Sequence, residues 1–269
     1  MSTAKGSMKP TIAILGATGG SALTVLVQTL QGGHDCIALV RTESKLTSLL
    51  TLRNVPDALI KQHLKIVTGN VKDAESISKT LFHESLKNGV VDIIVSGVGA
   101  KPVFMPNPLR PTLDDPTICQ DATSTILKSL RTMLKPNMKK PLFVVVSTTG
   151  ISDHGRDIPI AMIPLYHWML PVPHADKKKM EKLLETEVHG PDSAIGGFVA
   201  VRPSLLTDGD LLGVKAVRSD VEGEGTVAAN AIGYSISRSD VGNWIYTTLV
   251  NNEDGLRDSY VNHFVGITY

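Results

Sequence analysis

A glycine-rich turn near the start of the chain is the first feature whose residue types could do chemistry. Gly16, Thr18, Gly19 and Gly20 lie between a short apolar run and an amphipathic stretch over residues 19–31. Small residues let the backbone approach a pyrophosphate, whose charge then meets the amide donors of the following helix. The spacing is Gly-x-x-Gly-x-x-Ala rather than Gly-x-Gly-x-x-Gly, but the strand–turn–helix context predicts a dinucleotide site.

The position after the second apolar run discriminates between the two nicotinamide dinucleotides. An NAD site places Asp or Glu there to bind the ribose 2′-hydroxyl, whereas this chain has Arg41 followed by Lys45. An arginine can hold a 2′-phosphate with its planar fork, and a lysine adds a point charge. Glu43, the nearest acid, is expected at the start of the next helix, where it favours the helix dipole. The pattern predicts NADP(H), with an ordinary solvated cation as the alternative for Arg41.

Two further loops follow later apolar runs and fit the same crevice. After residues 64–68 a polar side chain and its backbone could hold the adenine edge, and after residues 91–95 small residues could lie against the cofactor ribose. The predicted cofactor contacts in these loops are Asn70, Val71, Gly97, Val98 and Gly99.

The elements that position these residues alternate along the chain. Short apolar runs are expected to be strands buried on both faces, and the three-to-four spacing between them indicates helices. The expected strands cover 11–15, 36–40, 64–68, 91–95, 142–146 and 198–201, and the first helices 19–31, 43–52 and 74–87. This predicts one α/β Rossmann-like domain over residues 1–269, a doubly wound parallel sheet with helices on both faces and a small C-terminal substrate-binding portion.

Composition excludes several classes of protein. The 27 Lys and Arg against 26 Asp and Glu give a net charge of +1, which argues against a nucleic-acid-binding protein. No apolar run approaches the roughly 18–20 residues of a membrane span, and residues 1–10, expected to be disordered, lack an apolar signal region. Two cysteines and scattered histidines without His-x-x-x-His predict no metal site. A cytoplasmic protein is expected.

The motifs together resemble the NmrA-like group of atypical short-chain dehydrogenases/reductases. The resemblance covers nearly the whole chain and is carried by Gly16–Gly20, Leu39–Arg41, Gly69–Asp73, Val144–Thr149, His174–Glu181, Val201–Pro203 and Ser239–Val241. It implies the Rossmann fold and NADP(H). The group contains reductases, cofactor sensors and non-redox enzymes, and the chain is also similar to fungal alkaloid-pathway members such as NADP-dependent Diels–Alder cyclases of the citrinadin type.

In the wider superfamily a Ser or Thr, a Tyr and a Lys four residues later carry the reaction. Thr149 fills the Ser/Thr place, and Lys177 lies nearest the apolar stripe of its predicted helix, whereas its two neighbours face solvent. The tyrosine place holds Pro173, so the usual pair is missing. His174, which titrates near neutrality, could act instead as acid or base. Tyr166 is a second candidate and Asp176 a weaker third.

The substrate side is expected to come from residues 101–119, 150–175 and 203–235. The first of these carries five prolines and is predicted to be an irregular loop, either a lid or a surface excursion. The second contains a predicted Pro-Val-Pro turn at 171–173 and Trp168, which would suit a flat apolar substrate. At the start of the third, Val201–Pro203 resembles the stretch that closes over the nicotinamide, and Pro203 is a predicted cofactor contact. Arg202 could lie over the nicotinamide or could equally be a buried ion-pair partner. A capped helix from Ser237 onward is expected to be structural.

These features predict an NADP(H)-dependent oxidoreductase acting on a small apolar polycyclic natural product, such as an indole alkaloid. It would reduce an iminium, enone or carbonyl, with cyclisation as a coupled step of a redox-mediated Diels–Alder type. The missing tyrosine keeps two alternatives open: a non-redox isomerase or cyclase with bound NADP(H) as a pocket wall, and an NADP(H)-sensing regulatory protein. No nucleic-acid or membrane partner is expected, and a homodimer is left open.

Overall fold

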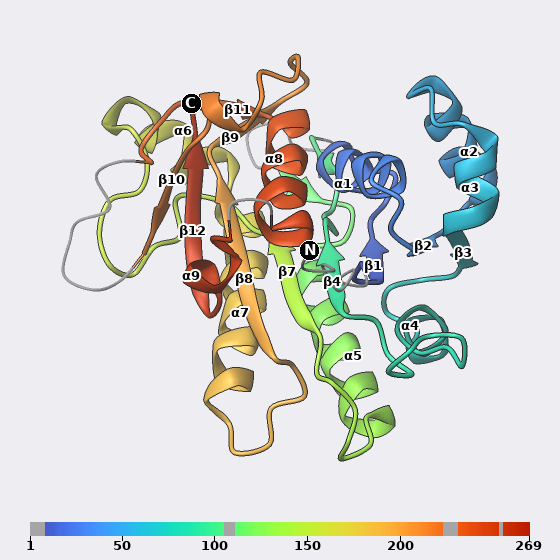
Figure 1. The fold of residues 1–269 in the computed structure, drawn as a ribbon. Helices are drawn as coiled ribbons and strands as arrows, with labels where there is room; N and C mark the ends of the chain where they lie inside the picture. The colour runs from blue at the N-terminus through green and yellow to red at the C-terminus, as the bar shows by residue number, and fades with distance from the viewer. Residues whose placement is uncertain (1–8, 105–110, 223–230, 253–254) are drawn as a thin grey trace, which may run out of the picture.

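An eight-stranded sheet runs through the middle of the molecule, in the order β10-β12-β8-β7-β4-β1-β2-β3 (Figure 1). The structure is a computed structural model that describes residues 9–104, 111–222, 231–252 and 255–269. All neighbouring strands are parallel except β10 and β12, which pair antiparallel. The predicted α/β fold is confirmed, and the strand order reverses between β1 and β4, where such sheets bind ligands.

The parallel strands agree closely with the predicted apolar runs. They are β1 (Ile12–Leu15), β2 (Cys36–Val40), β3 (Leu64–Thr68), β4 (Ile93–Ser96), β7 (Leu142–Val146), β8 (Gly197–Pro203) and β12 (His263–Thr268). The bounds of β2, β3 and β7 are those predicted. All residues of β1 and β2 are buried, as strands covered on both faces require. Because the strands are parallel, their carboxyl ends lie at one edge of the sheet.

Helices cover both faces of the sheet, and each face has its own apolar core. The helices are α1 (Gly20–Gln31), α2 (Glu43–Leu52), α3 (Asp57–His63), α4 (Ala74–Leu81), α5 (Ile118–Met133), α6 (Ile163–Met169), α7 (Pro171–His189), α8 (Arg238–Trp244) and α9 (Arg257–Tyr260). Side chains of α1, α2 and α8 share one core, and those of α4, α5 and α7 share the other. Successive side chains of β1 point to opposite faces of the sheet. Ile12 and Ile14 therefore lie in the first core, and Ala13 and Leu15 lie in the second.

Three predictions about local structure were wrong. Helix α4 ends at Leu81 rather than near residue 87, because Phe82 is extended and bridges to Val90. The proline-rich stretch 101–119 is not wholly irregular: β5 (Pro102–Val103) pairs antiparallel with β6 (Thr112–Leu113), and α5 begins at Ile118. Residues 105–110 of the suggested lid lie outside the described residues. The proposed turn at 171–173 is instead the first turn of α7, where proline is tolerated because its missing N–H has no intrahelical partner.

The C-terminal part of the chain returns to the main sheet. Nothing in the apolar pattern predicted β12 or its antiparallel neighbour β10 (Arg218–Val221). A small parallel pair, β9 (Leu205–Thr207) and β11 (Ser235–Ser237), lies near the carboxyl edge and leads into α8. Of the predicted substrate segment 203–235, residues 223–230 are outside the described part, as are residues 1–8 of the predicted disordered start.

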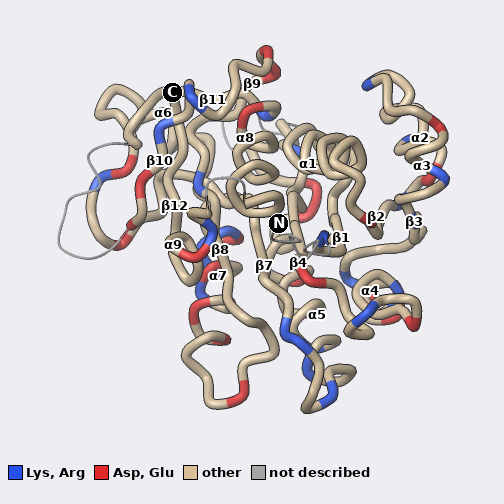
Figure 2. The backbone as a smooth tube through the Cα atoms, viewed as in Figure 1, with Lys and Arg blue, Asp and Glu red and all other residues tan. Residues whose placement is uncertain are grey.

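Charges of both signs are interspersed over the elements (Figure 2), in keeping with the near-neutral composition. Among the described residues, no helix is long and apolar enough to cross a membrane. The same residues hold no group of three or more His, Cys, Asp or Glu side chains that could bind a metal ion.

The contact between α1 and α8 depends on a glycine. A Cβ at Gly242 would lie 2.5 Å from the Ser21 carbonyl oxygen and 2.6 Å from Thr24 Cβ. Both distances are shorter than carbon contacts allow, so α8 approaches α1 through the space that a side chain would fill. This approach places the beginning of α8 beside the beginning of α1.

We predict that Gly242→Ala lowers the free energy of unfolding by about 1–3 kcal/mol, because the added methyl group overpacks the interface. Urea unfolding at neutral pH measures the change. Gly209→Ala is the control, since the nearest atom to its Cβ would lie at an ordinary 3.6 Å. Equal stability of the two variants would contradict the close approach of α8 to α1.

Candidate active site

The turn after β1 is built around two glycines whose backbones almost touch. Gly16 has φ +74°, and a Cβ there would lie 2.8 Å from the carbonyl oxygen of Gly97. A Cβ at Gly97 would in turn lie 2.7 Å from Ala22 Cβ in α1. The end of β4 therefore lies directly against the turn and the first part of α1, which needs small residues at all three positions.

The beginning of α1 is open to a ligand. Gly19 precedes the helix and has no side chain to cap it, whereas Asp73 and Ser237 cap α4 and α8 with their side chains. The Gly19 N–H donates to the Gly16 oxygen at 2.8 Å, which shapes the turn. The uncapped N–H groups of the first helical turn fit an anionic pyrophosphate, so the residues present suit a dinucleotide.

The predicted 2′-phosphate residues lie at the end of β2. Arg41 follows the strand, and residues 41–45 are exposed. Within the described ranges, neither Arg41 nor Lys45 forms an ion pair. Because β1 and β2 pair directly in parallel, Arg41 follows the strand end next to the one that carries the Gly16 turn.

The two remaining cofactor loops have different structures. Asn70 is exposed, and its Oδ1 accepts the Lys72 N–H at 3.0 Å, so this side chain shapes its own turn beyond β3. Val71 is half-buried in the same turn. After β4, the Val98 carbonyl oxygen faces Lys177, while a Cβ at Gly99 would meet nothing within 4 Å. The loop after β4 therefore packs closely against the Gly16 turn at Gly97 and borders open space at Gly99.

Lys177 is the lysine that reaches the carboxyl edge of the sheet. Its Nζ donates to the carbonyl oxygens of Val98, at 3.1 Å, and Val146, at 2.6 Å. Lys178 instead pairs with Asp153, and Lys179 is exposed. The helical spacing thus identified the residue that joins the ends of β4 and β7.

Thr149 and Tyr166 meet at the end of β7. Thr149 Oγ1 lies 3.3 Å from the Tyr166 hydroxyl and 3.3 Å from the Pro203 carbonyl oxygen, and both side chains are buried. The Thr149 N–H also donates to the Pro203 oxygen, which joins the ends of β7 and β8. Burial raises the pKa of Tyr166, against a lowering by its hydrogen bond to Thr149, so this phenol is protonated at neutral pH.

His174 packs beside the same pair. Its ring centroid lies 5.6 Å from that of Tyr166, and both rings cover Gly150, where a Cβ would lie 2.7 Å from Tyr166 Cδ1 and 2.8 Å from His174 Cε1. Burial, assisted by the nearby His167, lowers the pKa of His174 to about 4. Its buried Nε2 has no hydrogen-bond partner in the described part of the chain. His174 is therefore neutral near pH 7 and offers a free ring nitrogen.

Two other candidate side chains are engaged in structural bonds. Both carboxylate oxygens of Asp176 accept backbone N–H groups at the start of α5, those of Cys119 and Gln120, each at 2.9 Å. Asp176 thus caps α5 and has no place in the acid–base chemistry suggested for it. Arg202 is the ion-pair partner rather than a residue over the nicotinamide: it forms a two-pronged bond with Glu181, at 2.8 and 2.9 Å.

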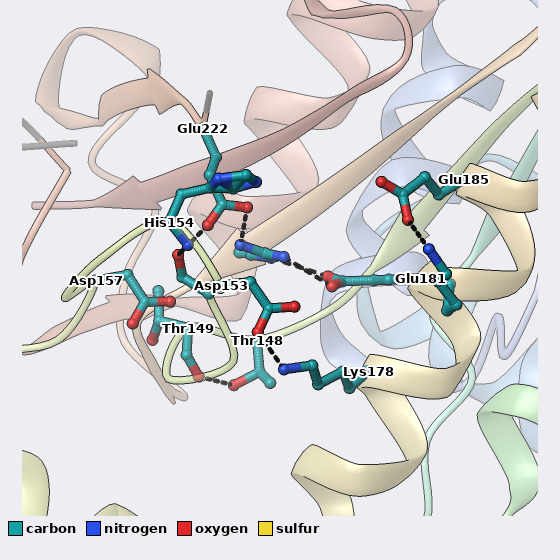
Figure 3. Close-up of polar contacts among 12 residues, drawn as sticks. Thr148, Thr149, Asp153, His154, Asp157, Lys178, Glu181, Glu185 and Glu222 are labelled. Atoms are coloured by element: carbon teal, nitrogen blue, oxygen red, sulfur yellow. Dashed lines mark hydrogen bonds and ion pairs between the residues drawn. The ribbon is translucent and has the colours of Figure 1, made fainter. Parts of the chain in front are cut away.

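Glu222 binds the same guanidinium from the other side, so one buried arginine joins α7, β8 and the end of β10 (Figure 3). The arginine also lies 4.5 Å over the ring of Phe264 in β12. Ser152 donates to Glu222 and so ties the segment after β7 to this cluster. The cluster fixes α7, which carries Lys177, against the sheet.

Sequence reasoning missed Gly150 and Asp157. Gly150 has φ +87°, and its N–H donates to Asp157 Oδ2 at 2.8 Å. Burial raises the pKa of Asp157, which lies with Thr149 in the lining of one small cavity. The glycine directly after Thr149 was the available signal, because a residue that must adopt positive φ beside a catalytic candidate marks a special turn.

Exposed apolar side chains gather on the segments predicted to form the substrate side. Among the described residues ten large apolar side chains are exposed, and seven of them lie in these segments. They are Phe104, Ile160, Trp168, Leu205, Leu211, Leu212 and Tyr234. These segments therefore present a more apolar surface than the rest of the molecule.

A family model described as NAD(P)H-binding matches residues 16–252. The chain belongs to this family. Membership in the NAD(P)H-binding family confirms the predicted cofactor class, and the match begins at Gly16, the first residue of the turn described above. The fold agrees with a solved member of the same structural class, the anaerobilin reductase ChuY of Escherichia coli O157:H7. That structure has a TM-score of 0.58 and 15% identity, with 95% of this chain and 96% of that one covered.

Two fungal relatives of this NAD(P)H-binding protein are similar over most of their length. The reductase pytE of Aspergillus terreus is 46% identical over 269 residues, which cover 98% of this chain and 99% of the relative. The oxidase pynE of Aspergillus niger is 36% identical, with 90% and 93% covered. Both names denote redox enzymes rather than cyclases, so the resemblance to citrinadin-type Diels–Alder cyclases stays a prediction.

We predict that His174 makes stability fall as the pH drops from about 6.5 to about 4. Its pKa is lower in the folded state, so the unfolded chain binds the extra proton in this range and is favoured. Chemical unfolding at about pH 7 and about pH 5 should show a smaller loss of stability for His174→Gln than for the wild type. Gln62→Ala, an exposed substitution without a titratable group, is the control and should keep the wild-type pH dependence. An unchanged pH dependence in His174→Gln would contradict the assignment.

Proposed function

We propose that the protein is an NADPH-dependent reductase of a small, apolar, polycyclic natural product. The observation that carries the proposal is the buried Thr149–Tyr166 hydroxyl pair, which lies with Lys177 at the carboxyl edge of the sheet where β4, β7 and β8 end. When bound, NADPH supplies the hydride. The names of the two fungal relatives, a reductase and an oxidase, support redox chemistry.

Tyr166 takes the role of the tyrosine that Pro173 replaces. Its raised pKa keeps the hydroxyl protonated, so it can donate a hydrogen bond and then a proton to a substrate carbonyl oxygen. Thr149 Oγ1 holds the same oxygen and orients the phenol. A neutral His174 cannot be the acid near pH 7, so its part is to pack on Tyr166 and to accept a hydrogen bond at Nε2.

Lys177 holds the nicotinamide ribose in this proposal. Two backbone carbonyls from adjacent strand ends fix its ammonium group, and one N–H remains for a ribose hydroxyl. Gly97, Val98, Gly99 and Pro203 supply backbone around that ribose. The Lys177 Nζ donates to these two carbonyl oxygens and not to the Tyr166 hydroxyl.

The substrate class rests on the apolar surface around this edge. Exposed side chains such as Trp168 and Leu212 suit a flat ring system with few polar groups. A carbonyl, enone or iminium is the reducible group, and an indole alkaloid or a cyclisation coupled to reduction is the more specific form of this proposal. The oxidase name of one relative makes the reverse direction, substrate oxidation by NADP⁺, a second candidate.

Incubation with NADPH, and separately with NADP⁺, tests the reaction against polycyclic ketones, enones and cyclic iminium compounds. Reduction is expected to consume NADPH and add two hydrogens to the product mass. Loss of two hydrogens with NADP⁺ would favour the oxidase. A new product of unchanged mass would indicate an isomerase or cyclase, and tight cofactor binding without turnover on any substrate would favour a sensor.

We predict that Tyr166→Phe lowers kcat about 100- to 10,000-fold, because the proton donor is lost. The Kd for NADPH should stay unchanged, since the phenol faces the substrate. Tyr246→Phe is the matched control, because its hydroxyl lies against Gly32 at the far end of α1. Full activity in Tyr166→Phe would exclude this tyrosine as the donor.

We predict that Arg41→Ala weakens NADPH binding about 10- to 100-fold and leaves NADH binding unchanged, because only NADPH carries the 2′-phosphate. Lys45→Ala should have the same selectivity with a smaller effect. Fluorescence titration with each cofactor measures both constants. Arg53→Ala, an exposed arginine at the end of α2, is the control. An equal loss for NADH and NADPH would contradict the assignment.

A further inference from the structure

Arg238 is the first residue of α8, and neither the motifs nor the proposed reaction uses it. A Cβ at Gly20 would lie 2.7 Å from Arg238 Cδ and 3.0 Å from its Cβ. The arginine stem therefore lies across Gly20, in the space that any other residue at position 20 would occupy. Gly20 is the first residue of α1, so the stem crosses the turn whose N–H groups lack a side-chain cap.

Among the described residues, the guanidinium of Arg238 has a single ion-pair partner. Its Nη1 lies 2.6 Å from Asp208 Oδ1, and the Asp208 side chain is 88% exposed. An ion pair this open to water contributes little to stability, so an incoming anion can replace it easily. Asp208 belongs to the segment after β9, which is tied to α8 because Asp240 accepts the N–H groups of Leu212 and Gly213.

We propose that Arg238 binds the pyrophosphate of the cofactor and that Asp208 is its partner while the cofactor is absent. The stem is fixed at the beginning of α1 by its contact with Gly20, whereas Arg41 lies at the end of β2. Arg238 thus binds the pyrophosphate that NADH and NADPH share, and Arg41 binds the 2′-phosphate that only NADPH carries. A guanidinium can hold two phosphate oxygens at once, and it adds a full positive charge to the N–H groups of the uncapped helix turn.

The proposal rests on the dinucleotide site shown by the family and is independent of the reaction. Fluorescence titration of the full chain with NADPH and with NADH tests it. Arg238→Ala is expected to weaken both cofactors to the same extent, about 10- to 100-fold, and Arg238→Lys by less. Asp208→Ala is expected to tighten both, because it releases the guanidinium. ADP-ribose, which keeps the pyrophosphate, should lose affinity in Arg238→Ala as well.

Unchanged binding of both cofactors in Arg238→Ala would overturn the proposal, and so would a loss confined to NADPH. Weaker binding in Asp208→Ala would mean that the ion pair builds the site rather than blocks the arginine. Thermal unfolding of each variant separates these outcomes from misfolding, and Arg53→Ala is the control for removing a positive charge. Arg41→Ala is expected to weaken NADPH binding alone, whereas Arg238→Ala is expected to weaken both cofactors. Failure of the 2′-phosphate assignment can therefore be told apart from failure of the pyrophosphate assignment.

Discussion

The close packing at Gly16, Gly20 and Gly97 is the constraint on which the candidate site depends. Gly16 and Gly97 meet through their backbones, and the side-chain stem of Arg238 lies across Gly20. A methyl group at any one of them would overlap the next strand, the helix or the stem of Arg238. Because these contacts leave no room for a Cβ at the three glycines, peptide groups and the stem of Arg238 form the surface there. The same compactness brings the end of β4 to Lys177 through the Val98 carbonyl oxygen.

The second half of the site is arranged around a helix that begins with proline. Pro171 and Pro173 start α7 without losing intrahelical hydrogen bonds, since the first-turn N–H groups have no partner there. Position 173 on this helix holds proline where the superfamily has tyrosine, and the short helix α6 presents Tyr166 to Thr149 instead. Gly150 makes this arrangement fit, because both Tyr166 and His174 pack over its missing side chain.

Much of the sheet could be predicted from local sequence, and the reasons are physical. Strands β2 and β7 are continuous apolar runs, β3 keeps apolar residues on either side of Lys65, and α2 follows its helical spacing from Glu43 to Leu52. Strands β10 and β12 were not predicted, because Gly266 and the polar residues of β10 interrupt any apolar run, and their pairing is set by tertiary contacts. Lys177 followed from helical periodicity. The contacts of Arg238 with Gly20 and of Asp176 with α5 join residues far apart in sequence, which no local pattern reveals.

The buried arginine cluster has a consequence for how this protein can change in evolution. Arg202 forms ion pairs with both Glu181 of α7 and Glu222 beyond β10, and all three side chains are shielded from water. Loss of the arginine would leave two buried carboxylates facing each other, and loss of either acid would leave part of the guanidinium unpaired. Replacing one of the three residues alone is therefore expected to cost more stability than replacing all three together, for instance by apolar residues of similar volume. The three positions should change together in evolution.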